Sequence, residues 1–299
     1  MKEVSQMLPF AYQAFSAVVH EGSFYKASLL LSVTPSAISH SISQLEKDFG
    51  FPVFVRNRAG AELTASGRTV LLIQDVVNSQ GRLQQEADRI NGLSIGSVRL
   101  GAFSSTCINW VPPIIQAFHE KYPDIQVSVY QNDFNAITQA VKDGTIDVGF
   151  TSLPVNENLL VKQLIRDEIY CIAPKDFKPK SSMEVTAEDL EGKSFILQQG
   201  DYDRDTKAAL DHYDIRQNSI QFSIDDQSIL AMVEAGLGFG ILPELALQTI
   251  SGNVQVFPFD KRFYRTICMV TTRTGAKSPA TQRMMKQVEE YVEGEYGGK

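Results

Sequence analysis

Residues 34–50 read TPSAISHSISQLEKDFG, and this stretch predicts a helix with two unlike faces. Thr34 is a suitable N-cap, and Pro35 follows at the first helical position, where a missing N–H group costs nothing. Apolar side chains recur within a narrow arc at about 100° per residue; they are Ile38, Ile42, Leu45 and Phe49. The stretch therefore predicts a helix over residues 35–49 that buries one side.

The opposite side of this helix carries short polar and charged side chains: Ser36, His40, Ser43 and Lys47. Hydroxyl, imidazole and ammonium groups suit hydrogen bonding to base edges and phosphates in a DNA major groove. On an isolated helix, the same face would be an ordinary solvated surface. Here a shorter helical pattern capped by Ser23 precedes it across the tight turn Ser32-Val33-Thr34. Two helices joined in this way form a helix-turn-helix, whose second helix enters the groove.

After Gly50, the segment FPVFVRNRAGAELT over residues 51–64 has the composition of a β-hairpin with its turn at residues 57–60. Arg56 and Arg58 are predicted at the tip of this hairpin. A hairpin in this place would act as a wing that brings two cations to the backbone phosphates of DNA.

Composition and charge set wider limits. A length of 299 residues with 43% hydrophobic residues predicts more than one folded domain. The net charge of −7 at first argues against nucleic acid, but residues 1–93 hold eight basic and eight acidic side chains. The acidic excess therefore lies in the remaining chain, and a neutral N-terminal region can still present clustered cations.

Other function classes find little support. The sequence has no apolar run long enough for a membrane span and no signal-peptide pattern at its start, so a cytoplasmic location is expected. The three cysteines are far apart and form no CxxC pair, so neither a disulfide framework nor a zinc site is expected. Buried filler is the plain interpretation of each thiol, and a redox switch is the alternative. No enzyme motif and no cofactor are expected.

The run FSAVVHEGSFYKASLLLSVTPSAISHSISQLEKDFGFPVFVRNRAGAELTASG, residues 15–67, resembles the LysR-type transcriptional regulators. GSF followed by Ala27, SAIS before Leu45-Glu46, Phe54-x-Arg56 and Leu63-Thr64-x-x-Gly67 occur in the order and spacing of that family. The layout of the rest of the chain is similar to the family too.

The resemblance implies a sequence-specific DNA-binding regulator, and it brings Ser39 and His40 forward as DNA contacts. Where many members carry Gln-Pro at the start of the recognition helix, this chain has Pro35-Ser36, so a glutamine base contact does not carry over. The predicted DNA-contacting residues are Thr34, Pro35, Ser36, Ser39, His40, Ser43, Lys47, Arg56 and Arg58.

Residues 66–93 contain no proline, and their composition predicts one long linker helix. Apolar residues along it follow the spacing of a coiled-coil seam with one polar exception, Gln80; they are Ile73, Val76, Leu83, Ala87 and Ile90. We expect this helix to pair with the same helix of a second chain. The alternative is that it packs along the C-terminal part of its own chain, residues 94–299. In the LysR-type proteins this helix pair makes the dimer.

From Ser97 onward, short strands alternate with helices, which predicts a largely parallel α/β sheet. The predicted organisation is a winged helix-turn-helix domain (1–65), a linker helix (66–93) and a two-lobed α/β effector-binding domain (94–299). Residues 97–161 and 270–299 would form lobe I, and residues 162–269 would form lobe II. The resemblance implies the same two-lobed form, similar to periplasmic solute-binding proteins.

Polar residues at the predicted strand ends are the candidates for effector binding, because ligands of open α/β sheets collect beyond the carboxyl ends of the strands. Hydroxyl groups beside the start of a helix suit a small carboxylate or another anion, although plain N-capping would explain one of them. An aspartate facing the cleft would favour an amino-acid-like ligand, although helix capping is the alternative. The candidates are Ser104, Ser105, Thr106, Thr151, Ser152, Gln198, Gln199, Asp201 and Asp226.

The expected partners are double-stranded DNA with an interrupted inverted repeat, a small-molecule effector, a second copy of the chain, and two further copies in a tetramer. RNA polymerase is a further candidate partner. A stand-alone small-solute-binding protein of the transport type is the alternative function, but it would leave residues 1–93 without a role. The glycine-rich segment GLGFG at 236–240 follows a predicted helix and precedes a strand, so it indicates a helix end and a turn rather than a dinucleotide site.

Overall fold

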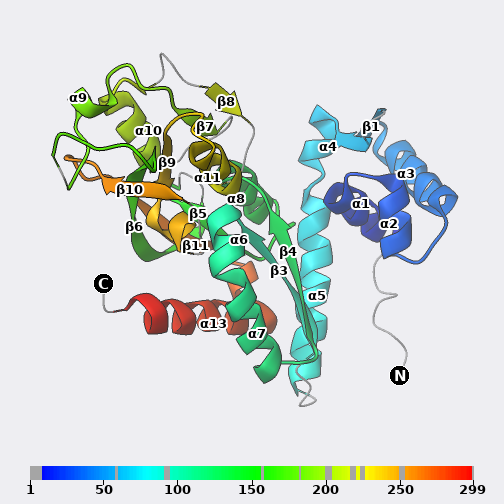
Figure 1. Cartoon of the computed structure of the whole chain (residues 1–299). Helices are drawn as coiled ribbons and strands as arrows, with labels where there is room; N and C mark the ends of the chain where they lie inside the picture. Colours follow the sequence, from blue (N-terminus) through cyan, green and yellow to red (C-terminus); the bar gives the residue numbers. More distant parts are fainter. Residues whose placement is uncertain are drawn as a thin grey trace. The chain divides into compact units, whose positions relative to one another are not determined.

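The computed structural model describes residues 9–57, 60–90, 95–155, 158–181, 183–198, 204–215, 220–222, 226–248 and 253–297, and Figure 1 shows the whole chain. The chain forms two compact units. The first is Met1–Gly96 with Asp143–Thr145 and Lys277–Pro279, and the second is Ser97–Lys142, Ile146–Ala276 and Ala280–Lys299.

The first unit begins with three helices and a small hairpin. In the described residues its elements are α1 (Phe10–Glu21), α2 (Phe24–Leu30), α3 (Pro35–Phe49), β1 (Phe54–Asn57), β2 (Gly60–Leu63), α4 (Ala65–Thr69) and α5 (Leu72–Ile90). The Thr34 hydroxyl accepts a hydrogen bond from the N–H of Ala37, 3.2 Å away. Helix α3 therefore begins at its predicted cap, and it ends at Gly50 with a left-handed φ of 77°.

One hydrophobic core holds these helices and the hairpin together. Ile38 and Ile42 of α3 are fully buried beside Phe15 of α1. The ring centroids of Phe15 and Phe54 lie 5.4 Å apart, so the hairpin is anchored to α1. Burying a side chain of this size contributes about 1.5–3 kcal/mol, and the apolar stripe of α3 faces inward as predicted.

The predicted single linker helix is wrong at its start. Helix α4 ends at Thr69, and α5 begins only at Leu72. Ile73, predicted as a seam residue, is 5% exposed and packs in the core of the first unit. The first turn of α5 therefore belongs to the core of the first unit, because burying the Ile73 side chain there is more favourable than exposing it to solvent. Residues 91–94 lie outside the described residues.

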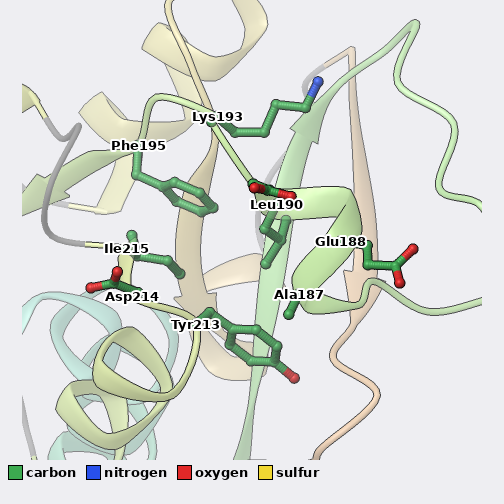
Figure 2. A pocket seen from close by; sticks show the side chains of 10 residues that line it. Ala187, Glu188, Leu190, Lys193, Phe195, Tyr213, Asp214 and Ile215 are labelled. Carbon is green, nitrogen blue, oxygen red and sulfur yellow. The ribbon is translucent and has the colours of Figure 1, made fainter.

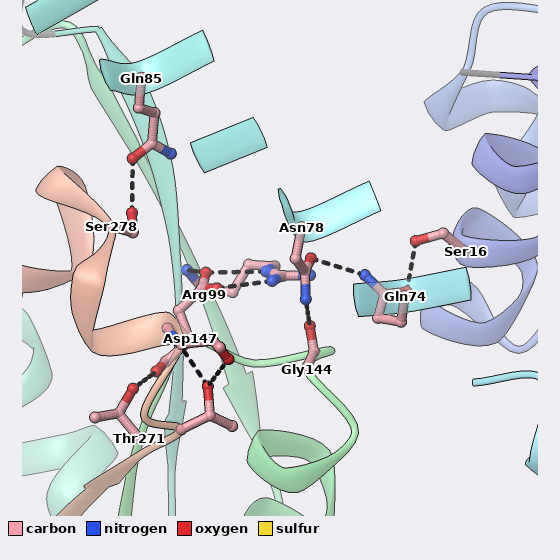
Figure 3. Close-up of polar contacts among 12 residues, drawn as sticks. Ser16, Gln74, Asn78, Gln85, Arg99, Gly144, Asp147, Thr271 and Ser278 are labelled. Carbon is pink, nitrogen blue, oxygen red and sulfur yellow. Dashed lines mark hydrogen bonds and ion pairs between the residues drawn. The ribbon is translucent and has the colours of Figure 1, made fainter. Parts of the chain in front are cut away.

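Helix α5 has one polar, hydrogen-bonded face (Figure 3). The Ser16 hydroxyl donates to Oε1 of Gln74 at 2.7 Å, and Nε2 of Gln74 donates to Oδ1 of Asn78 at 3.0 Å. Asn78 in turn donates to the carbonyl of Gly144, which belongs to a short segment of the same unit. By angular position at 100° per residue, the opposite face carries Leu72, Val76 and Leu83, which are 69%, 43% and 56% exposed.

The second unit is an α/β domain. Its described elements are β3 (Gly96–Ala102), α6 (Ser104–Asn109), α7 (Val111–Lys121), β4 (Ile125–Gln131), α8 (Phe134–Lys142), β5 (Val148–Ser152), β6 (Leu160–Pro174), α9 (Ala187–Leu190), β7 (Ile196–Gln198), α10 (Arg204–His212), β8 (Ile220–Phe222), α11 (Asp226–Glu234), β9 (Gly240–Pro243), α12 (Glu244–Leu247), β10 (Val254–Pro258), β11 (Tyr264–Thr271), a 3-10 turn (Gly275–Lys277) and α13 (Pro279–Tyr296).

A seven-stranded sheet runs through this unit in the order β10-β6-β11-β5-β3-β4, with β9 also paired to β6. Strands β3 and β5 are parallel, with Leu100 opposite Val148. Arg99 and Asp147 reinforce this pairing through hydrogen bonds of 2.7 and 3.0 Å from the guanidinium to the carboxylate (Figure 3). Strand β11 is antiparallel to both β5 and β6.

The unit has the predicted two lobes. One core contains Trp110, Phe118 and Phe150 and lies around β3, β5 and α13. The other lobe holds the cores around Phe195 and Ile229. Strand β6 serves both lobes, because residues 160–168 pair with β11 while its later residues pair with β9 and β10.

Two helices follow β3 in place of one continuous helix, because α6 ends before Trp110. Pro112 and Pro113 follow this junction and lack the N–H groups that would bond back to the preceding turn. The GLGFG segment forms the predicted helix end and turn, since α11 ends at Glu234 and Gly236 has a φ of 75°. In the described part of the chain, every helix is too short or too polar to cross a membrane.

Candidate functional site

The outer face of α3 is the first candidate site. Ser36, His40, Ser43 and Lys47 are all exposed, while Leu45 on the other side is 4% exposed. Thr34 and Pro35 are also exposed at the start of the helix. The polar side chains predicted to contact DNA therefore lie together on one solvent-facing side of a helix that the core holds firmly.

Arg56 links the hairpin to this helix. It lies in β1 opposite Ala61, one pair before the end of the hairpin, rather than at its tip as predicted. Its Nη1 donates to the hydroxyl of the half-buried Ser39 at 3.2 Å. Its guanidinium carbon lies 3.8 Å from the centre of the Phe24 ring. A cation–π contact of this kind contributes about 0.5–1 kcal/mol when exposed, so Arg56 holds its charge next to α3. Arg58 lies outside the described residues.

The second candidate site is at the carboxyl edge of β3 and β5. Leu100 is opposite Val148 across these parallel strands, so both strands end at the same edge of the sheet. Ser152 is the last residue of β5, and Ser104 begins α6 two residues after the end of β3. Both hydroxyl oxygens are buried, and neither has a hydrogen-bond partner among the described residues. A buried hydroxyl without a partner costs about 1–3 kcal/mol, so two of them at one sheet edge indicate a place for a polar ligand.

The other predicted hydroxyls of this lobe have partners within the protein. Thr106 donates to the carbonyl of Phe103 at 2.8 Å. Ser105 accepts a hydrogen bond from Arg265 at 2.8 Å, and the Thr151 hydroxyl lies 3.1 Å from that of Thr138. All three predicted residues are buried. Their hydroxyls are therefore structural in this state, and sequence reasoning did not separate them from Ser104 and Ser152.

The predicted residues of the second lobe are less well defined. Asp226 is buried as the first residue of α11 and has an interaction within the protein. Gln198 ends β7, but its side chain lies outside the described residues. Gln199 and Asp201 also lie outside them.

A buried ion pair next to Ser105 was not predicted. The side chains of Asp167 and Arg265 approach to 2.7 Å and are 1% and 5% exposed. Burial raises the pKa of the Asp167 carboxyl, while the Arg265 guanidinium and the N–H of Leu245 oppose that rise. Asp167 and Arg265 are charged residues in separate strands, so only the pairing of those strands reveals the contact.

A cavity of about 420 Å³ lies elsewhere in the second lobe (Figure 2). Leu190, Phe195, Tyr213 and Ile215 contribute apolar surface, and Lys193 extends away from it. Among the predicted effector residues whose side chains the structure describes, none lines it. Sequence reasoning missed this cavity because its walls come from two loop-rich segments with no motif.

The described residues contain no cluster of histidine, cysteine and carboxylate side chains that could hold a metal ion. Cys171 and Cys268 are buried and Cys107 is half-buried. Burial raises the pKa of the Cys107 thiol to about 11. A thiol with such a pKa is a poor nucleophile at neutral pH, which favours the filler interpretation for Cys107.

Comparisons with known sequences place both units in one family. Residues 11–68 match the family described as "Bacterial regulatory helix-turn-helix protein, lysR family", and residues 91–293 match the "LysR substrate binding domain". A curated relative from Synechococcus elongatus, "Probable HTH-type transcriptional regulator LrrA", is 31% identical over 246 residues, which cover 81% of this chain and 83% of the relative.

Solved structures share the fold over nearly the whole chain. A full-length OxyR variant from Pseudomonas aeruginosa has a TM-score of 0.74 at 20% identity, covering 96% of this chain and 95% of that chain. Full-length CbnR in complex with its target DNA has a TM-score of 0.62 at 20% identity, covering 95% of this chain and 99% of that chain.

Proposed function

We propose that this chain, which belongs to the LysR family of bacterial DNA-binding transcriptional regulators, binds its operator through the exposed face of α3 and responds to a small carboxylate or amino-acid-like anion held by Ser104 and Ser152. The family supplies the general function, a regulator with an effector-binding domain. The residues, the chemistry of the effector and the assembly are the proposal.

The observation that carries the DNA interface is the sidedness of α3. Its apolar stripe completes the core, and its polar side chains face solvent with Arg56 beside them. Short side chains at Ser36, His40 and Ser43 would reach base edges, and Lys47 and Arg56 would contact phosphates. Residues 1–65 act as the DNA-binding domain, residues 66–93 as the linker and residues 94–299 as the effector-binding domain.

The linker supports pairing of two chains. One face of α5 is already hydrogen-bonded through Gln74 and Asn78 within its own unit. The opposite face leaves Leu72, Val76 and Leu83 exposed in the single chain. Two copies that bury this stripe would carry two α3 helices to the half-sites of an interrupted inverted repeat. Contacts between effector domains would build the tetramer from two such dimers.

The effector site rests on the two partnerless hydroxyls. Ser104 and Ser152 can each donate one hydrogen bond to an oxygen of a small anion. Since the burial cost of these hydroxyls is already present in the free protein, a ligand that accepts from both recovers it. A carboxylate has two oxygens that can accept from two such donors.

The DNA interface is tested by gel shift of the full chain on the DNA that flanks its own gene. His40→Ala and Lys47→Ala are each expected to weaken binding by about 1–3 kcal/mol. Lys286→Ala is the matched control, because Lys286 is 76% exposed on α13 and loses the same charge. Equal binding by the Lys47 and Lys286 variants would show that the proposed face of α3 is not the DNA-binding face.

The effector site is tested by thermal shift of the full chain with a panel of monocarboxylates, dicarboxylates and amino acids. A compound that stabilises the wild type should fail to stabilise Ser104→Ala and Ser152→Ala, whereas DNA binding without effector should persist in both variants. Unchanged stabilisation in both variants would rule out this site. Binding of a solute without any binding of DNA would favour the transport-type alternative.

A further inference from the structure

The place where the chain passes from one lobe to the other holds a buried charge pair. Asp167 of β6 and Arg265 of β11 are opposite each other in the antiparallel register. Nε of Arg265 donates to Oδ2 of Asp167 at 2.7 Å, and both residues are at most 4% exposed. A charge pair in such a place is held only when its remaining donors and acceptors are also satisfied.

The remaining donors and acceptors of this pair lead to two helices. Nη2 of Arg265 donates to the hydroxyl of Ser105 in α6, 2.8 Å away. Oδ1 of Asp167 accepts from the backbone N–H of Leu245 in α12 at 2.9 Å. The charge pair therefore joins the start of α6 to α12 from one side.

Asn109 joins the same two helices from the other side. Its Nδ2 donates to the carbonyl of Leu245 at 2.7 Å and to the carbonyl of Ser105 at 3.0 Å. Ser105, Asn109, Leu245, Asp167 and Arg265 thus form a closed ring of hydrogen bonds, which we call the crossing ring. Two separate arms, one through the charge pair and one through Asn109, connect α6 with α12.

Through α12, the crossing ring contacts the cores of both lobes. Leu245 is 1% exposed and packs in the core around Trp110, whereas its neighbour Ala246 packs in the core around Ile229. Helix α12 therefore touches both lobes. On the other side of the ring, Ser105 directly follows Ser104, whose hydroxyl is one of the two partnerless donors.

We propose that the crossing ring positions Ser104 for the effector and transmits any displacement of α6 at that site to α12 and the second lobe. Asp167, Asn109 and Arg265 are positioning residues and do not touch the ligand. Because the Asp167–Arg265 pair in the ring is buried, opening that arm leaves charged groups without partners. A shift of the first turn of α6 therefore moves the ring as one body. This inference rests on the proposed effector site.

The test is amide hydrogen exchange of the full chain, with the amides of α12 as the readout and no ligand present. Ser105→Ala cuts the arm through Arg265, and Asn109→Ala cuts the other arm. Each is expected to speed exchange at residues 244–247 by about fivefold, the effect of losing one ordinary hydrogen bond. The double variant is expected to exceed the product of the two single effects, because only then is α6 released from α12.

Two further variants keep the test specific. Arg265→Lys retains the charge but lacks the forked donor that reaches Ser105, so it should resemble Ser105→Ala. Ser104→Ala is the matched control on the same helix turn, and it should leave exchange of α12 unchanged. Exchange of α13 should stay constant in all variants, whereas a general loss of structure would move it as well.

Faster exchange confined to α6, with α12 unchanged in the double variant, would overturn the inference. So would single effects that simply multiply. Neither result depends on an effector, so failure of the crossing ring is distinct from failure of the effector site, which the ligand titrations of Ser104→Ala and Ser152→Ala decide.

Discussion

Alanine substitutions of the neighbouring residues Ser104 and Ser105 should change the free energy of unfolding in opposite directions. Ser104→Ala removes a buried hydroxyl without a partner, whereas Ser105→Ala removes the acceptor of a buried Arg265 N–H. The first change removes a burial cost of about 1–3 kcal/mol, and the second creates a cost of similar size. Alanine also gains about 0.5 kcal/mol of helix propensity at either position. The two variants should therefore differ in unfolding free energy by at least about 2 kcal/mol, with Ser104→Ala the more stable.

Urea unfolding of the full chain measures this difference, because the only tryptophan of the sequence reports on the right place. Trp110 is fully buried at the junction of α6 and α7, and its ring centroid lies 5.5 Å from that of Phe150. With an m value of about 2–3 kcal/mol/M for a domain of this size, 2 kcal/mol separates the midpoints by about 0.7–1 M. Equal losses of stability in both variants would refute the reasoning, since Ser104 would then have a partner in the free protein.

Three further predictions address other parts of the chain. Gly67→Ala should destabilise the first unit by about 1–3 kcal/mol, because the new Cβ would lie 2.1 Å from the carbonyl oxygen of Val53. Gly81→Ala on α5 should instead be stabilising by about 1 kcal/mol, because the new Cβ would meet no described atom within 4 Å beyond the adjoining backbone of its own helix. Circular dichroism during urea unfolding compares the two, and equal effects would contradict the expectation. Leu83→Glu should shift the chain toward a monomer in size-exclusion chromatography with light scattering, whereas Leu237→Glu, at a similar 54% exposure, should not; an unchanged dimer in the first variant would exclude the α5 stripe. Cys107 should react with iodoacetamide at pH 8 roughly 100-fold more slowly than free cysteine, because its raised pKa lowers the thiolate fraction. The rate of this reaction should rise with a midpoint at a pH of about 11. A midpoint near pH 8.5, or the same rate of protein labelling in Cys107→Ser, would contradict this.

The sequence predicts the first unit well because its signals are local. The cap at Thr34, the apolar stripe of α3 and the glycine at its end all lie within a few turns of one another, and the structure places them as predicted. The first half of β6 carries a much weaker signal in the sequence. Residues 160–168 pair only with β11 among the described strands and carry charges such as Lys162 and Arg166, as edge strands often do.

The sequence predicts hydroxyl groups at a sheet edge, but it does not predict the bonding of each one. Sequence position identifies the hydroxyls at the ends of β3 and β5, yet it does not show which of them are already bonded. Ser105 differs from Ser104 only through Arg265, which lies 160 positions further along the chain. Likewise, α12 and the charge pair depend on strands that meet across the lobes. Such partners follow from tertiary register, and a single sequence does not contain that register in readable form.

The continuity of β6 limits how the two lobes can respond to a bound molecule. Strand β6 is fifteen residues long and is paired with β11 in one lobe and with β10 in the other. A wide hinge-like opening between the lobes would therefore break backbone hydrogen bonds of the shared sheet. Small sliding or twisting motions keep those bonds. The shared strand therefore favours a response in which the two lobes turn slightly against each other while the pairing of β6 stays intact.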